Sequence, residues 1–74
     1  MDFTPLSSIS PGNRIRIASV PKKIHKRLLS LGLPPGTRLS VLRNRNGSVV
    51  IGRHHDRMAI GRALAEQIQV QKSL

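Results

Sequence analysis

Apolar and polar residues alternate along several short segments of the chain, and this alternation predicts β-strands. In the first segment, residues 13–20, Ile15 and Ile17 alternate with Arg14 and Arg16. A period of two places the isoleucines on one face of a strand and the arginines on the opposite, wetted face. The same period recurs at residues 37–43, 57–61 and 67–71, and the apolar run within residues 48–53 predicts a further strand. The pattern therefore predicts about five short strands, each with one buried side.

The segment between the first two predicted strands has the period of a helix instead. Ile24, Leu28 and Leu31 follow the i, i+4, i+7 spacing that aligns side chains along one side of an α-helix. Pro21 suits the first turn of this helix, where its missing N–H is no loss. Outside the apolar stripe lie Lys22, Lys23, Lys26 and Arg27. We therefore expect a short amphipathic helix with a basic outer face.

Glycine and proline then end this helix and turn the chain. Gly32 lies where a left-handed residue would end the helix, and Leu33 is placed to fold back onto its last turn. Pro35–Gly36 fits the centre of a type II turn, because proline fixes φ at the first position and glycine tolerates a positive φ at the second. Pro11–Gly12 is a similar turn signal before the first strand. Each of these glycines has a backbone reason for its position.

The second half of the chain predicts two tight turns and one helical turn. Asn46–Gly47 between two apolar runs is a strong hairpin signal, and residues 54–56 make a second turn. Gly52 suggests a bulge or bend. Residues 61–67 predict a single helical turn with Ala63 and Leu64 packing inward.

Together these elements predict one mainly-β domain over residues 1–74. Its architecture is a small antiparallel barrel of about five strands. A short helix lies between strands 1 and 2, and a one-turn helix precedes the last strand. Residues 1–5 and 72–74 are expected to be flexible.

The composition limits both the core and the partners of this domain. The 74 residues include no Cys and one aromatic residue, Phe3, so the core has to be small and aliphatic. Thirteen Lys and Arg against Asp2, Asp56 and Glu66 give a formal charge of +10. Such an excess favours a nucleic acid, the inner face of a membrane or an acidic protein. With no signal-peptide pattern and no membrane-spanning run, we expect a cytoplasmic protein.

The order and spacing of these residues resemble the FeoA family, the small SH3-like proteins of bacterial ferrous-iron uptake. The resemblance covers roughly residues 6–71 and rests on the runs SPGNRIRI, LLSLGLPPGTRLSVLR and MAIGRALAEQIQV. Its marks are Pro11, Gly12, Leu28, Leu29, Leu31, Gly32, Pro35, Gly36, Val41, Ile60, Gly61, Ala65, Ile68 and Val70. To six of these marks we assign a structural role, namely Pro11, Gly12, Leu28, Gly32, Pro35 and Gly36.

The resemblance implies a cytoplasmic, non-enzymatic accessory protein, for which peripheral association with the inner face of the inner membrane is a further hypothesis. Its implied partner is FeoB, the ferrous-iron transporter with a cytoplasmic GTP-binding domain. The sequence itself shows no nucleophile motif, paired carboxylates or phosphate-binding glycine loop. The partner surface that we expect is the basic helix side, formed by Lys22, Lys23, Lys26 and Arg27. The sequence leaves the oligomeric state open.

A metal site is a further hypothesis. His54, His55 and Asp56 form the densest group of potential ligands for a divalent first-row metal. Adjacent strand residues point to opposite faces, however, and Arg53 and Arg57 repel cations. We therefore favour a solvated hairpin turn with no required cofactor, and keep weak divalent-metal binding as the alternative.

The rival functional hypothesis is a basic barrel that binds nucleic acid. Small barrels bind single strands through a basic groove with stacking aromatic residues. The charge is present here, but Phe3 is the single aromatic residue. Binding through phosphates alone would be weak, unspecific and steeply dependent on salt, so nucleic acid is not the favoured partner.

Overall fold

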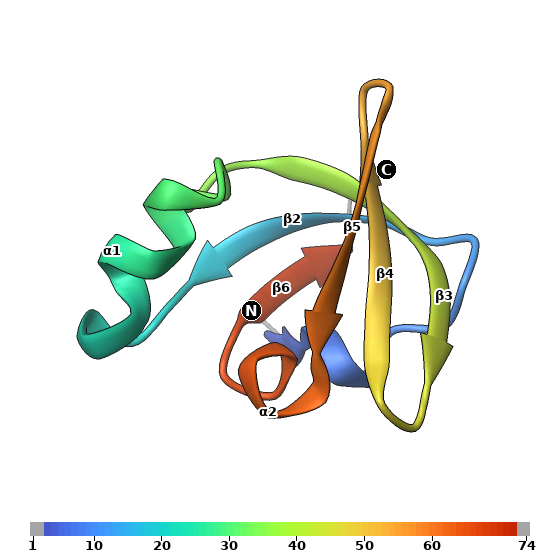
Figure 1. Ribbon diagram of the computed structural model, residues 1–74, viewed down its shortest axis with the longest axis horizontal. Coiled ribbons are helices and arrows are strands. Elements are labelled where there is room, and N and C mark those ends of the chain that lie inside the picture. Colours follow the sequence, from blue (N-terminus) through green and yellow to red (C-terminus); the bar gives the residue numbers. More distant parts are fainter. Residues whose placement is uncertain (1–2, 73–74) are drawn as a thin grey trace.

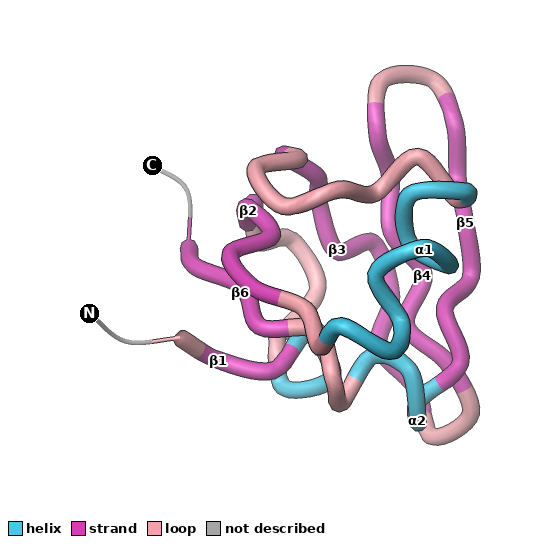
Figure 2. The backbone as a smooth tube through the Cα atoms, turned by 90° about the vertical axis from the view of Figure 1, so that its left-hand side faces the viewer, coloured by secondary structure: helices cyan, strands magenta, loops and turns pink. Residues whose placement is uncertain are grey.

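An antiparallel sheet of six strands forms the body of the molecule (Figure 1). The computed structural model describes residues 3–72. In chain order the elements are β1 (Thr4–Pro5), the 3-10 helix η1 (Leu6–Ser8), β2 (Arg14–Ser19), α1 (Lys22–Ser30), β3 (Arg38–Arg45), β4 (Ser48–Arg53), β5 (Asp56–Gly61), α2 (Arg62–Ala65) and β6 (Gln69–Lys72). The strand order is β1-β6-β2-β3-β4-β5, so the first and last strands of the chain lie side by side (Figure 2). The predicted mainly-β class and both helix positions are confirmed.

Two successive hairpins build one half of the sheet. Asn46–Gly47 joins β3 to β4 as predicted, and β4 pairs with β5 along its whole length. The sheet irregularity lies in β3, where Leu42 is the extra residue between Val41 and Arg43, and not at Gly52 as the sequence suggested. Gly52 is paired regularly with Ser40 and Arg57. Its missing side chain leaves space for Leu42, since a Cβ at Gly52 would lie 3.0 Å from Leu42 Cδ1.

The core is aliphatic and comes from the inward faces of the strands together with the helices. In β2, Ile15 and Ile17 are buried, whereas Arg14 and Arg16 are exposed, as the alternation predicted. Within residues 3–72 no polar or charged residue is classed as buried. The core cluster consists of Leu6, Ile9, Ile15, Ile17, Ile24, Leu28, Leu33, Leu39, Val41, Val49, Ile51, Ile60, Ala65, Ile68 and Val70.

Helix α1 ends in a Schellman motif, as predicted. The Leu33 N–H donates to the Leu28 carbonyl at 2.8 Å, and the Gly32 N–H donates to the Leu29 carbonyl at 3.0 Å. Gly32 has a φ of +76°, and Leu28 and Leu33 are both buried, which supplies the apolar contact of this motif. At the other end, Pro21 is the N-cap and not the first helical residue. No helix in the described part of the chain is long and apolar enough to cross a membrane.

The type II turn that follows α1 is confirmed. The Thr37 N–H donates to the Pro34 carbonyl at 3.1 Å, and Gly36 has a φ of +94°. The Gly36 N–H in turn donates to the Ile17 carbonyl at 2.7 Å, which ties the turn to the end of β2.

Three details of the prediction are wrong, two on side-chain burial and one on the start of a strand. Leu31 is 37% exposed, because it is the C-cap residue, where the chain leaves the helix. In α2, Ala63 is exposed and Ala65 is buried in its place, whereas Leu64 packs against the core as predicted. Strand β6 begins at Gln69 and not at Gln67, since the Gln67 N–H is already bonded to the Leu64 carbonyl at 3.0 Å.

The described ends of the chain are paired. Thr4 pairs with Val70, and Pro5 pairs with Gln69, so two residues of the start that we expected to be flexible form β1. Lys72 ends β6 and pairs with Ile15. Residues 1–2 and 73–74, also expected to be flexible, lie outside the described residues.

Side chains of Asn44 and Arg62 join the segments at one end of the sheet. Asn44 Nδ2 donates to the carbonyls of Ser7 and Ile9, at 2.9 and 2.8 Å. Arg62 Nε donates to the Asn46 carbonyl at 2.8 Å, and Nη2 donates to Asn44 Oδ1. These bonds connect η1, the β3–β4 hairpin and α2, which lie in separate parts of the sequence. We call this group the Asn44–Arg62 network.

We expect Asn44→Ala to lower the free energy of unfolding by about 2 kcal/mol, because partly buried carbonyls lose their donors. The matched control is Asn46→Ala, since the Asn46 side chain is exposed and only its carbonyl accepts a bond in the network. Urea unfolding monitored by circular dichroism measures both. Equal stability of the two variants would contradict the structural importance of the network.

Gly36→Ala tests the positive φ without adding a clash, because no atom lies within 4 Å of the added Cβ. We expect a loss of about 1–2 kcal/mol from the left-handed backbone alone. Gly61→Ala is the control, because Gly61 has a φ of −58° and equally open surroundings. Thermal unfolding compares the two variants, and an unchanged midpoint for Gly36→Ala would refute the assigned turn.

Candidate partner-binding surfaces

The cationic residues of α1 lie together on its outer side. Helix α1 flanks the sheet (Figure 1) and buries Ile24 and Leu28. The four residues predicted as a partner surface are all exposed, and we call them the basic helix face: Lys22, Lys23, Lys26 and Arg27. Leu29, which is 50% exposed, follows Lys26 by three residues and so adjoins this face.

The basic helix face has no compensating negative charge on its own helix. The first turn of α1 contains no acidic residue, and Pro21 provides no side-chain cap. Lys22 and Lys23 lie at the positive end of the helix dipole, where a cation is disfavoured by roughly 0.3–1 kcal/mol. An anionic partner at this end of α1 would relieve that repulsion.

The two adjacent histidines form the loop of the β4–β5 hairpin. Arg53 pairs with Asp56 across the hairpin and leaves His54–His55 between them. His54 has a φ of 56°, a left-handed conformation that is uncommon for residues other than glycine. His54, His55 and Asp56 are all exposed.

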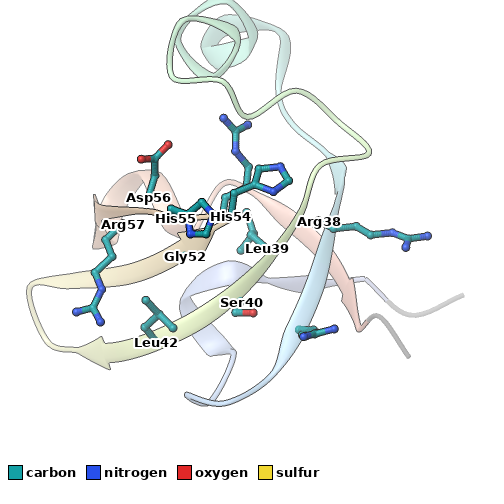
Figure 3. A pocket seen from close by; sticks show the side chains of 11 residues that line it. Arg38, Leu39, Ser40, Leu42, Gly52, His54, His55, Asp56 and Arg57 are labelled. Carbon is teal, nitrogen blue, oxygen red and sulfur yellow. The ribbon is translucent and has the colours of Figure 1, made fainter.

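These three residues are neighbours, but they do not form a recognisable metal centre. Within residues 3–72, no three His, Cys, Asp or Glu side chains are grouped so that they could hold a metal ion. Figure 3 shows the Asp56 carboxylate and the Arg57 guanidinium pointing away from each other on either side of the hairpin.

A cleft of about 620 Å³ lies between β3 and the tip of the β4–β5 hairpin (Figure 3). Its lining combines arginines with an aliphatic floor. We call it the basic cleft and define it by Arg14, Arg38, Leu39, Leu42, Arg53 and Arg57, with the His54–His55 loop at its rim. Arg38 and Arg57 extend from opposite sides of it (Figure 3).

Arg53 differs from the other arginines of the basic cleft, because its guanidinium has a partner within the fold. Its Nη1 donates to the Gly32 carbonyl at the end of α1. Arg53 also lines a smaller cavity of about 250 Å³, which Leu31 and Met58 help to form. The hairpin is thereby attached to the end of α1.

The sequence indicated the histidines of this region but not the cleft itself. The alternation in β2 and β3 did place Arg14 and Arg38 on a wetted face. It could not show that Arg14 pairs with Ser40 in the sheet, which brings these arginines onto the same side as the hairpin tip. The period-two pattern of each strand thus indicated that these arginines are exposed. It contained no information on the register between β2 and β3.

The three glycines assigned a structural role, Gly12, Gly32 and Gly36, use their backbone donors within the fold. The Gly12 N–H donates to the Val41 carbonyl at 2.8 Å, and Gly12 has a φ of +92°. The donors of Gly32 and Gly36 are likewise bonded, in the Schellman motif and to β2. These glycines therefore offer no free N–H groups to an anion.

Comparison with known proteins adds three findings. A protein of Methanocaldococcus jannaschii named "Putative Fe(2+) transport protein A" is 46% identical over 46 residues, which are 62% of this chain and 56% of that protein. A crystal structure of an iron uptake regulatory protein, FeoA, is 31% identical with a TM-score of 0.85, covering 99% of this chain and 100% of the other. A solution structure of FeoA protein from Chlorobium tepidum is 28% identical with a TM-score of 0.76, covering 93% and 70% of the two chains.

The family assignment follows from a match over nearly the whole described chain. Residues 4–72 match the model of the FeoA domain. The resemblance to the FeoA family, which rested on the order and spacing of these residues, is therefore confirmed. The small SH3-like fold is confirmed as well. The chain belongs to the FeoA family.

Proposed function

We propose that this protein is a non-enzymatic accessory protein of bacterial ferrous-iron uptake. It acts in the cytoplasm by binding the cytoplasmic part of an FeoB-type inner-membrane transporter and altering its assembly or GTP cycle. The observation that carries the proposal is the match to the FeoA domain over residues 4–72. The similarity to a protein named for Fe(2+) transport supports the same process.

The basic helix face supports an anionic docking surface near a membrane. Its four cations are exposed on one short helix, without an acidic residue in the first turn. Each Lys or Arg close to an anionic lipid surface contributes about 1 kcal/mol. An acidic patch on the transporter and the inner leaflet beside it would both attract this side of the protein.

Within residues 3–72, the hydroxyl and imidazole groups around the basic cleft are not joined as a nucleophile and its base. Ser40 contributes a hydroxyl to the lining, which also includes His54 and His55. General-base activation requires such groups to lie within hydrogen-bond reach of each other. Among the hydrogen bonds found within residues 3–72, none joins Ser40 to either histidine.

The direct test is calorimetric titration of the protein into the purified cytoplasmic domain of the transporter and into the full-length transporter. We expect binding that weakens with salt. The double substitution Lys22→Glu with Lys26→Glu should lower the affinity at least tenfold, because like charges would then face each other.

The matched control reverses two exposed charges away from α1, with Arg45→Glu and Lys72→Glu. It should change the affinity much less than the α1 pair does. Absence of binding to either form of the transporter at about 0.15 M salt, together with unchanged ferrous uptake after gene deletion, would refute the proposed function.

Weak metal binding at the hairpin tip is a separate prediction. With exposed residues of one loop as ligands, we expect zinc binding far weaker than at a closed site with four ligands. Calorimetry compares the native protein with His54→Ala/His55→Ala, and uses His25→Ala on α1 as the control. Sub-micromolar affinity that disappears only in the double variant would establish a metal site there instead.

A further inference from the structure

We propose that the basic cleft binds an acidic, extended peptide segment of a partner protein and holds an aliphatic side chain of that segment on its leucine floor. This site is distinct from the basic helix face, which lies on α1. It goes beyond the proposed function, because it names a second surface and the chemistry of its ligand. The inference stands whichever protein supplies the segment.

Unpaired guanidinium groups make the basic cleft a receptor for anions. No side-chain hydrogen bond or ion pair found within residues 3–72 involves the guanidinium groups of Arg14, Arg38 and Arg57. The one carboxylate among the lining residues is that of Asp56. Arginine binds carboxylates through two parallel N–H donors, so each free guanidinium can take one acidic side chain.

The positions of these arginines favour an extended ligand over a single small anion. Arg38 and Arg57 extend from opposite sides of the cleft and do not converge on one point (Figure 3). Arg14 belongs to β2, Arg38 to β3 and Arg57 to β5, so the charges come from three strands. A chain with carboxylates spaced along it can reach several of them, whereas one phosphate cannot.

The floor of the cleft favours a peptide over a nucleic acid. Leu39 and Leu42 line it, and Leu42 is 43% exposed where it folds over Gly52. An exposed leucine between cations offers an aliphatic side chain a place to be buried. Single-stranded nucleic acids instead use aromatic stacking platforms, and Phe3, the single aromatic residue of the chain, is not among the lining residues.

Two structural constraints hold the cleft in shape before a ligand arrives. Arg53 fixes the hairpin to the end of α1 through the Gly32 carbonyl. The hairpin turns in two residues, His54–His55, which leaves little freedom at the tip. A site that is ordered beforehand loses less conformational freedom when a ligand binds.

The test is fluorescence anisotropy with a fluorescein-labelled synthetic peptide of Asp and Glu around a central Leu. We expect saturable binding that weakens with salt. Arg38→Ala/Arg57→Ala should weaken it at least tenfold, whereas Arg45→Ala/Lys72→Ala, which removes the same charge outside the cleft, should weaken it less than about threefold. Equal weakening by both pairs would show attraction to net charge alone and overturn the proposal.

A double-mutant cycle tests the leucine floor. Replacing the central Leu of the peptide by Ala should weaken binding to the native protein several-fold, and should have little effect on the Leu42→Ala variant. Amide chemical shifts confirm that each variant is folded and show where the peptide binds. Additive effects of the two changes, or peptide-induced shifts confined to α1, would overturn the proposal.

An oligothymidylate of equal charge separates the two classes of polyanion. We expect it to compete with the peptide only weakly at about 0.15 M salt. Tighter binding of the oligonucleotide at the same cleft residues would overturn the peptide assignment in favour of nucleic acid. If the native protein binds the transporter but does not bind the peptide, this inference alone is refuted and the proposed function stands.

Discussion

The Asn44–Arg62 network joins segments that the strand order leaves without a backbone ladder between them. The sheet runs from β1 to β5, and these two end strands are not neighbours in it, so the barrel is not closed by a backbone ladder between them. Backbone carbonyls of the N-terminal segment therefore depend on side-chain donors. Asn44 bonds to Ser7 and Ile9, and Arg62 adds bonds to the β3–β4 turn. These side-chain bonds hold η1, the β3–β4 hairpin and α2 together at one end of a small aliphatic core that has no disulfides.

Arginine has two different roles in this chain, and the presence or absence of a hydrogen-bond partner for the guanidinium separates them. Arg62 and Arg53 donate to carbonyls of distant segments and hold elements together. Arg14, Arg38 and Arg57 surround a cleft and keep their donors for solvent or a ligand. Because acidic residues are rare, the positive charge is not compensated within the fold. The basic helix face and the basic cleft are therefore two separate surfaces that suit an anionic partner.

Local sequence predicted those features that one short segment decides by itself. Gly32 and Leu33 form the Schellman motif, and Gly36 adopts the positive φ of the type II turn, because glycine has no Cβ and adopts a positive φ without steric strain. The alternation in β2 predicted which side chains are buried, since a strand has only two faces. Asn46–Gly47 likewise marked a hairpin. The left-handed residue of the second hairpin, His54, gave no such signal, because histidine adopts that conformation only when the flanking strands impose it.

The sequence by itself thus determined the class of fold, the helix and the motif that ends it, the main turns and the family. Tertiary structure alone decided the pairing of β1 with β6 and the position of the extra residue at Leu42. It also brought Arg14, Arg38 and Arg57 around one cleft. The physical reason is range: caps, turns and strand periodicity depend on residues a few positions apart. The register between strands and the shared side of three separate arginines depend on how the whole sheet closes around its core.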